Sequence, residues 1–314
     1  MVLIASWITT EMNDFYISRK RMIKQRVPKR IKTPNVNIQN KGLNRNSIDK
    51  FYTKESVAKL CVDEVKRFIM IDENDIVIEP SAGDGAFIEG IKELSNNYMF
   101  YDIEPEHEEI IRQDFLNLNI NNLKQENIHI VGNPPFGRQS TSAIQFIKKC
   151  CEFASSISFI LPKSFKKDSM QKYFPLNYHL IFEMDLQSDS FLVNNEETDV
   201  PCVFQIWIRR NEMRNKIIKL TPIDFEFVKQ SETSSHPDIS FRRVGVYAGK
   251  ISPFNDKDTK SIQSHYFIKF TNGLSLDENL NRLKYINFEY DNTVGPKSIS
   301  KQELIKEFNR VLAH

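Results

Sequence analysis

Apolar residues in the central part of the chain alternate between helical and strand-like spacing. Between Ser56 and Ile69 they recur every three to four residues, which predicts a helix with one buried face. Ile76–Ile78 is a β-branched run that ends at Glu79-Pro80 and predicts a buried strand. The same patterns predict further helices over 86–94, 106–112 and 141–153, and further strands over 98–101, 128–131, 157–161, 178–184 and 200–208. Strands separated by helices indicate a doubly wound α/β sheet with ligands at the carboxyl ends of its strands.

From about residue 211 the pattern changes to short strand-like pieces, 241–247 and 265–270, and a helical pattern over 301–312. We therefore expect a basic arm over 1–47, an α/β domain over 48–210 and a small C-terminal α+β domain over 211–314. A chain of 314 residues with 40 % hydrophobic and 27 % charged residues is long and apolar enough for about two globular domains.

Positive charge is concentrated at the amino-terminal end. Residues 1–50 carry 11 Lys and Arg against 3 acids, whereas the rest of the chain carries 32 basic and 38 acidic residues. Pro28 and Pro34 argue against a continuous helix through the densest basic stretch. The pattern predicts a flexible arm that neutralises phosphates, with nucleic acid as the expected partner.

The apolar amino-terminal segment, the cysteines and the histidines indicate the compartment and the absence of a metal site. The apolar opening, Met1–Ile8, is too short to span a bilayer and lacks the pattern of a signal peptide, so we expect an intracellular protein, cytoplasmic or nuclear and not secreted. Four cysteines without CxxC spacing and six histidines without metal spacing predict buried free thiols and no metal site. Oligomeric state is left open.

A glycine-containing loop, Ser81–Gly85, joins a predicted strand to a predicted helix, where backbone amides can receive a ligand. The third glycine of a dinucleotide motif is replaced by Ile88, which argues against a pyrophosphate. Asp102 ends the next strand and is placed to accept hydrogen bonds from ribose hydroxyls. Together these residues predict a nucleoside ligand.

The segment Asn133-Pro134-Pro135-Phe136 follows another strand. Its chemistry suits methylation of a conjugated amine, whose lone pair is delocalised and therefore a poor nucleophile. The Asn133 side-chain oxygen and the Pro134 carbonyl can each accept one N–H bond and free that lone pair, and the prolines fix the acceptors in place. Phe136 would stack on the planar group.

With these residues the chain resembles the S-adenosylmethionine-dependent adenine-N6 methyltransferases with an N-P-P-[YF] signature and gamma-type motif order. The resemblance covers about residues 48–209 and implies a Rossmann-like class I methyltransferase fold, mostly parallel with an antiparallel strand near its end, and S-adenosylmethionine as cofactor. Because target recognition is carboxyl-terminal in that family, the resemblance also implies that residues 211–314 form a substrate-recognition domain. It also implies cofactor contacts from Tyr52, Thr53, Glu79, Ser81, Ala82, Gly83, Asp102, Ile103, Asp114, Phe115 and Asn133.

By the same resemblance Asn133, Pro134, Pro135 and Phe136 are catalytic, and Phe191 is a second aromatic against the flipped base. Lys163 and Arg138, which follow strand ends, are candidate phosphate ligands.

The expected function is methyl transfer from S-adenosylmethionine to the exocyclic N6 amine of adenine in nucleic acid. DNA is favoured, and RNA, with a cap-proximal or structured adenosine, is the first alternative because Phe136 stands where DNA enzymes usually have Tyr. Protein glutamine-N5 methylation uses the same tetrapeptide, and an inactive nucleic-acid-binding module is the remaining alternative.

Overall fold

The computed structural model describes residues 51–119, 127–193, 196–216, 218–229, 236–255, 260–288 and 297–313. The chain divides after Ser47, and all of the described residues belong to the second unit, Ile48–His314. The basic arm predicted for residues 1–47 lies outside the described residues.

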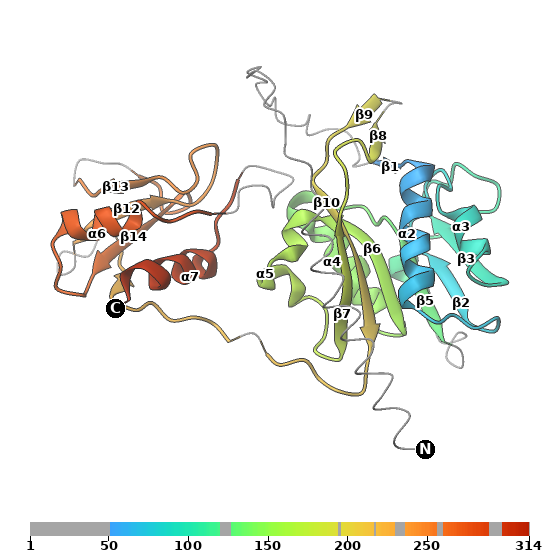
Figure 1. The fold of residues 1–314 in the computed structure, drawn as a ribbon. Helices are drawn as coiled ribbons and strands as arrows, with labels where there is room; N and C mark the ends of the chain where they lie inside the picture. The colour runs from blue at the N-terminus through green and yellow to red at the C-terminus, as the bar shows by residue number, and fades with distance from the viewer. Residues whose placement is uncertain are drawn as a thin grey trace. The chain divides into compact units, whose positions relative to one another are not determined.

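A seven-stranded sheet forms the framework of the larger part (Figure 1). Its strands, in order across the sheet, are β4 (Ile111–Arg112), β3 (Asn97–Asp102), β2 (Ile76–Glu79), β5 (Ile128–Gly132), β6 (Ser156–Pro162), β10 (Cys202–Arg209) and β7 (Tyr178–Asp185). The first five are mutually parallel, and β10 runs antiparallel to both β6 and β7. This confirms the expected class I methyltransferase fold, with its antiparallel strand near the end of the sheet.

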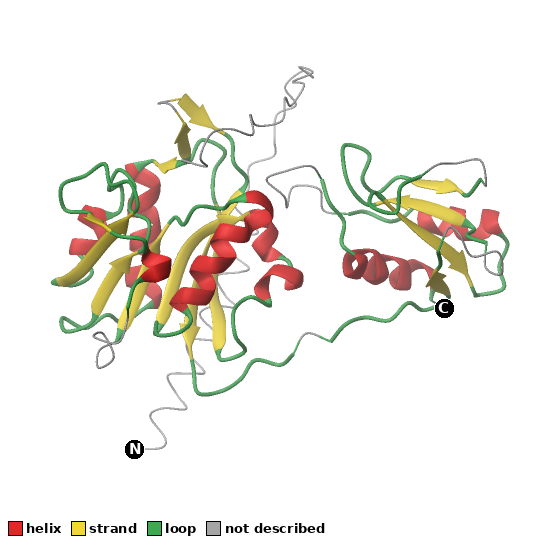
Figure 2. Cartoon of the chain, turned by 180° about the vertical axis from the view of Figure 1, so that it is seen from behind, coloured by secondary structure: helices red, strands yellow, loops and turns green. Residues whose placement is uncertain are grey.

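Helices cover both faces of this sheet. Helix α2 (Glu55–Phe68) lies in front of it in Figure 1, beside α3 (Ile88–Lys92), and α4 (Thr141–Cys150) lies in front in the reverse view of Figure 2. The short helix α5 (Asp168–Gln171) follows β6. Because both faces are covered, every position of β2, β5 and β6 is buried, which explains their nearly continuous apolar sequences.

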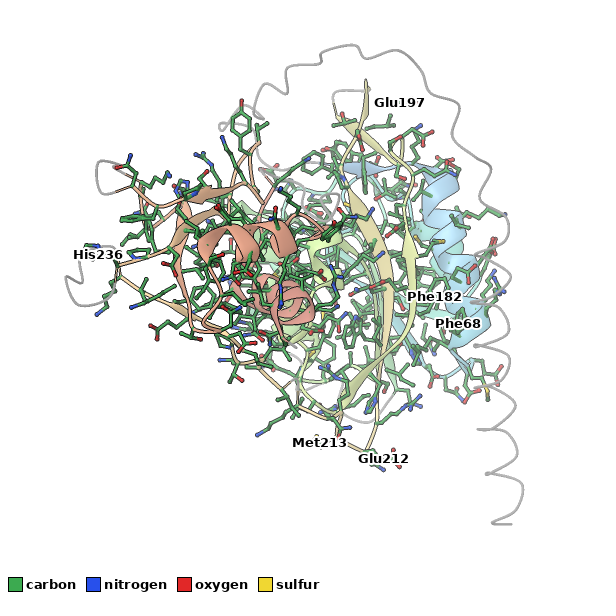
Figure 3. The ribbon with its side chains drawn as sticks, turned by 60° about the vertical axis from the view of Figure 1, so that its left-hand side comes forward. Phe68, Phe182, Glu197, Glu212, Met213 and His236 are labelled. Carbon is green, nitrogen blue, oxygen red and sulfur yellow. The ribbon has the colours of Figure 1, made fainter. Side chains whose placement is uncertain are left out.

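Helix α2 shows how the helical spacing becomes packing. Its buried face carries Ala58, Cys61 and Val65. One turn later, Phe68 stacks on Phe182 of β7 with ring centroids 4.6 Å apart (Figure 3). All four cysteines of the chain are buried and free, as predicted.

Three predicted elements differ in the structure. The segment 106–112 is a turn followed by β4 and not a helix, because Ile111 and Arg112 pair with the end of β3 and the Glu106 amide donates to the Gly83 carbonyl at 3.0 Å. Helix α3 is shorter than the predicted 86–94. The strand expected over 241–247 is shifted to Ile239–Arg242, and residues 245–249 form a turn.

The C-terminal part has its own antiparallel sheet, in the order β11 (Phe225–Phe227), β14 (His265–Phe270), β12 (Ile239–Arg242) and β13 (Ile251–Pro253). Helices α6 (Leu276–Leu283) and α7 (Lys301–Leu312) complete it, and each begins with a Ser–Glu capping box. Ile239, Phe241, Ile268 and Phe308 belong to a hydrophobic cluster separate from that of the seven-stranded sheet. The α+β character matches the expectation, and the boundary at residue 210 stays a prediction.

A third, small sheet joins distant parts of the sequence. Strand β1 (Tyr52–Thr53) pairs antiparallel with β8 (Phe191–Val193), which forms a hairpin with β9 (Glu196–Thr198). Thr53 lies opposite Phe191, and the Lys54 side chain pairs with Glu197 of the hairpin at 2.6 Å. No helix among the described residues is long and apolar enough to cross a membrane.

Candidate functional site

The candidate site lies at the carboxyl edge of the parallel strands. Strand β2 ends at Glu79, β3 ends at Asp102, and β5 leads through Gly132 into Asn133. These strands are neighbours in parallel register, so their ends come to the same edge of the sheet. The edge therefore collects the glycine loop, the acid expected to bind ribose and the Asn-Pro-Pro-Phe segment.

The glycine loop folds tightly against the end of β3. Gly83 and Gly85 have positive φ values of 56° and 91°, a region that glycine adopts readily. The Gly83 amide donates to Asp102 Oδ2 at 2.9 Å, and the Ala82 amide donates to the Tyr101 carbonyl at 2.9 Å. The loop thus keeps a fixed position beside Asp102, with Ala82 buried.

Asp102 is placed by backbone groups on both of its oxygens. Besides the bond from Gly83, Asp102 Oδ1 accepts from the Glu104 amide at 2.8 Å. A carboxylate oxygen has a second lone pair, so both oxygens keep acceptor capacity. Ile103, next in the chain, has a 63 % exposed side chain. An exposed apolar side chain next to a fixed acid suits a ligand with a polar sugar and a flat ring.

Glu79 is a buried acid in the floor of the site. It is 2 % exposed, and its Oε2 has no hydrogen-bond partner among the described residues. Burial, together with the negative charges of Asp84 and Asp102, raises the pKa of Glu79 well above its ordinary value. A cationic ligand group beside Glu79 would favour its ionised form and satisfy the orphaned oxygen.

The side chain of Asn133 has a defined orientation. Its Nδ2 donates to the Phe51 carbonyl at 3.2 Å and to Thr53 Oγ1 at 3.1 Å. Since a carbonyl can only accept, the nitrogen must face Phe51, and the oxygen points the other way. That oxygen, Oδ1, is inaccessible to water and has no partner among the described residues. The Asn133 carbonyl also accepts from Ser81 Oγ at 3.3 Å, which ties it to the glycine loop.

The backbone after Asn133 is sharply bent. Gly137 has φ +67°, and the non-glycine residues Gln139 and Ser140 have φ values of 54° and 61°. Side chains are strained in this region, and such strain gathers at functional sites. The Phe136 carbonyl accepts from the amides of Ser142 and Ala143, at 3.1 and 3.3 Å, at the start of α4.

The aromatic residues expected to hold a base are buried. Phe136 is 6 % exposed, and its ring stacks against Phe51 with centroids 6.1 Å apart. Phe191 is fully buried, in the strand opposite Thr53. The structure therefore brings Phe51, Thr53, Asn133 and Phe136 together, and Phe191 lies opposite Thr53 in the paired strand.

Other predicted site residues have structural partners. Asp114 caps a turn by accepting from the Leu116 amide at 3.0 Å, and Phe115 is buried against Phe146. Tyr52 donates from its hydroxyl to Glu106, and its ring lies over Gly83. Lys163 Nζ pairs with Asp185 at 3.6 Å, whereas Arg138 is exposed directly after the Asn-Pro-Pro-Phe segment.

One cluster of hydrogen-bonded polar side chains was not predicted from the sequence. His129 contacts Ser156 Oγ through Nδ1 at 2.7 Å and Asp75 Oδ2 through Nε2 at 3.2 Å. The three side chains are buried at the amino ends of their strands, at the opposite edge from Asn133, so they stabilise the fold and do not reach a ligand. Only their positions at successive strand starts could have signalled the cluster. Among the described residues, no group of three His, Cys, Asp or Glu side chains is arranged to hold a metal ion.

Comparison with known families gives one match. A family model described as the EDM2 methyltransferase-like domain matches residues 73–216, somewhat less than half of the chain. The matched segment contains the glycine loop, Asp102 and the Asn-Pro-Pro-Phe segment. No protein of curated function matches the chain in sequence.

Several solved structures are similar at low identity. The 23S rRNA methyltransferase ErmE is 16 % identical over 52 % of this chain and 71 % of its own, with a TM-score of 0.39. An rRNA methylase from Streptococcus thermophilus is 15 % identical over 49 % of this chain and 94 % of its own, with a TM-score of 0.33. A type I restriction-modification methyltransferase subunit from the same organism is 14 % identical over 52 % and 45 %, with a TM-score of 0.38. Likenesses this distant do not identify an activity.

Proposed function

We propose that this protein transfers a methyl group from S-adenosylmethionine to the exocyclic N6 amine of adenine in nucleic acid, with DNA favoured over RNA. The observation that carries the proposal is the fixed carboxamide of Asn133. Its nitrogen is held by Phe51 and Thr53, so its buried oxygen is left as an acceptor in need of an N–H donor. The matched methyltransferase-like family supports the reaction class.

The residues at the carboxyl edge suit the cofactor. When bound, S-adenosylmethionine supplies a methyl group activated by a positively charged sulfur. Asp102 would accept from its ribose hydroxyls, and the orphaned Oε2 of Glu79 would accept from its ammonium group. The Ser81–Gly83 loop with Tyr52 and Thr53 would line the methionine end, and Ile103, Asp114 and Phe115 the adenine end.

The remaining residues act on the substrate amine. Asn133 Oδ1 and the Pro134 carbonyl would each accept one N–H bond, which localises the nitrogen lone pair. Because Asn133 is already oriented by Phe51 and Thr53, its carboxamide needs no reorientation to accept this bond, once a local movement has uncovered the buried Oδ1. Pro135 stiffens the turn that presents both acceptors.

Base stacking requires one local movement. The ring of Phe51 lies against Phe136, where an adenine would stack. The Phe51 carbonyl can keep its bond to Asn133 while the ring rotates about its side-chain torsion, so the base can replace the ring without disturbing the acceptor. Phe191 would support the base from behind, and Arg138 and Lys163 would contact phosphates.

A methyl-transfer assay tests the proposal. Radiolabelled S-adenosylmethionine is offered with duplex DNA, single-stranded DNA, capped RNA and a glutamine-containing peptide, and methylated nucleosides are identified by mass spectrometry. We expect N6-methyladenine, and a rate lowered by about 10²-fold or more in Asn133→Ala, the scale of losing one preorganised polar group in a transition state. Asn281→Ala, the same substitution at an exposed position of α6, should keep the wild-type rate.

The outcomes are separable. If the radiolabel appears only in the peptide, the acceptor is glutamine and not adenine. If it appears only in RNA, the substrate is RNA and not DNA. Equal rates in wild type and Asn133→Ala would contradict the assignment of Asn133.

A further inference from the structure

An exposed turn in the C-terminal part, residues Gly245–Gly249, presents two large apolar side chains to solvent. Val246 is 84 % exposed and Tyr247 is 68 % exposed. The two side chains are adjacent and form a small apolar patch, whereas apolar side chains exposed singly are ordinary on a protein surface. We call this pair of residues the Val246–Tyr247 tip.

The tip is held by a dense set of backbone hydrogen bonds. The Ala248 amide donates to the Gly245 carbonyl at 2.9 Å, the Gly249 amide to the Arg242 carbonyl at 2.7 Å, and the Gly245 amide to the Lys297 carbonyl at 2.9 Å. Gly245 and Gly249 have φ values of 92° and 93°, which glycine alone adopts without strain. The exposure of the tip is therefore built into the turn.

Packing beneath the turn explains why the tip points outward. Ala248, the next residue, is buried in the C-terminal hydrophobic cluster together with Phe241 and Ile299. The small Ala248 side chain anchors the turn to the core, and this leaves the two larger side chains before it with no place inside. An ordinary surface turn would carry polar residues at these positions.

The charge around the tip favours a polyanion. Between Asp238 and Asp256 the sequence has no acid, and it carries Arg242, Arg243 and Lys250. The Arg242 Nε donates to the Val244 carbonyl at 3.1 Å, which holds its guanidinium beside the turn. The guanidinium of Arg243 lies over the Tyr266 ring at 5.2 Å, and Lys250 is exposed. Apolar side chains that have basic residues next to them in the chain suit contact with bases flanked by phosphates.

We infer that the Val246–Tyr247 tip contacts the bases of bound nucleic acid, with Tyr247 stacking on or wedging against a base and the flanking basic residues binding phosphates. This inference rests on the proposed nucleic-acid substrate and adds a contact outside the site of methyl transfer. It assigns to the C-terminal part a specific role in holding the substrate.

Binding measurements without cofactor test the inference separately from methyl transfer. Fluorescence anisotropy is recorded with a labelled 30-base-pair DNA duplex, the corresponding single strand, and single-stranded RNA of the same sequence. We expect Tyr247→Ala to weaken binding of at least one probe about tenfold, the effect of losing one base–aromatic stack, and Tyr247→Phe to restore it. Tyr285→Ala is the matched control, because Tyr285 is another largely exposed tyrosine of the C-terminal part, at 80 %.

Salt dependence separates stacking from charge. Tyr247→Ala should leave the slope of log affinity against log salt unchanged, whereas Lys250→Gln should reduce its magnitude by about one. Wild-type affinity in Tyr247→Ala, equal weakening in Tyr285→Ala, or failure of the wild-type protein to bind any probe would overturn the inference. Normal binding of a probe by the wild-type protein, without methyl transfer to any substrate, would overturn the proposed function and leave this inference standing.

Discussion

A side-chain amide is a dependable acceptor only when its nitrogen is engaged elsewhere. Asn133 meets this condition through two bonds to the segment 51–53, more than 75 residues away in the sequence. Three residues with positive φ follow, Gly137, Gln139 and Ser140, and they turn the chain into α4. At the scale of single residues, the site depends on this turn as much as on the side chains it carries.

Gly137 is the residue of this turn that tolerates a side chain least. A Cβ added there would lie 2.3 Å from Ser142 Oγ and 3.0 Å from the Ser142 amide nitrogen, and its φ of +67° disfavours any L side chain. We expect Gly137→Ala to lower the free energy of unfolding by roughly 3 kcal/mol, from strain and steric overlap together.

Gly273→Ala provides the control for Gly137→Ala. Gly273 has a similar φ of +73°, but a Cβ there would meet nothing within 4 Å. Its cost should be only about 1 kcal/mol, from backbone strain. Denaturant unfolding of the two variants measures the difference, and equal costs would contradict the clash with Ser142.

At the scale of elements, the two edges of the large sheet have different roles. The carboxyl edge carries the acids and the Asn-Pro-Pro-Phe segment. One oxygen of Glu79 and the side-chain oxygen of Asn133 have no hydrogen-bond partner there within the described part of the chain. The amino edge carries the satisfied cluster of Asp75, His129 and Ser156. A parallel sheet separates these roles because equivalent ends of its strands lie on one side.

The amino-edge cluster predicts a pH dependence of stability. Burial lowers the pKa of His129 below its ordinary value of 6.5, although Asp75 partly opposes this. Below about pH 6.5, His129 is therefore protonated in the unfolded chain and still neutral in the folded protein. The free energy of unfolding consequently falls as the pH decreases. Asp75 adds to the loss at lower pH, because bonds from Asp72 and His129 lower its pKa despite burial.

His129→Leu isolates this contribution. We expect the variant to lose about 1–3 kcal/mol at pH 7, because Asp75 and Ser156 each lose their contact with the His129 ring. Its pH profile should be flatter between about pH 6.5 and 5 than that of the wild-type protein. His179→Leu, at a histidine that contacts the Glu212 carbonyl and lies outside the amino-edge cluster, is the control for a His-to-Leu substitution as such. Parallel profiles for wild type and His129→Leu would contradict the assignment.

The whole molecule combines two hydrophobic cores with an uneven distribution of charge. The larger core belongs to the seven-stranded sheet and the smaller to the C-terminal part. Residues 1–50 hold a net charge of +8 within a chain of net charge +2, so the remainder is acidic overall. An acidic body approaches a polyanion poorly, which makes locally basic segments important for binding.

Removal of the basic arm tests this distribution. We expect deletion of residues 1–46 to weaken DNA binding and to flatten its dependence on salt, because fewer counterions are released. Binding of S-adenosylmethionine, measured by calorimetry, should stay within about twofold, since the proposed cofactor residues begin at Tyr52. An unchanged salt slope would remove the arm from the binding surface.

Much of the fold could be predicted because it depends on local patterns. Burial of β2, β5 and β6 can be predicted from their β-branched runs. The buried faces of α2 and α7 can be predicted from their helical spacing of apolar residues. The prediction of a helix over 106–112 was wrong because the end of this segment, Ile111 and Arg112, pairs with β3. The spacing of apolar residues does not reveal such pairing. Short elements at sheet edges are decided by partners and less by propensity.

The sequence alone determined the chemistry available to this protein: two rigid acceptors after a strand, a glycine loop, an acid after the next strand, and a basic amino-terminal stretch. Only the tertiary structure decided how these groups act. It turned the Asn133 nitrogen toward Phe51 and Thr53, and it left the Asn133 Oδ1 and the Glu79 Oε2 without partners among the residues that the structure describes. It also fixed Tyr247 outside the C-terminal core. The orientation and burial of a side chain depend on neighbours that are distant in the chain. The pattern of residues along the sequence does not specify which neighbours these are.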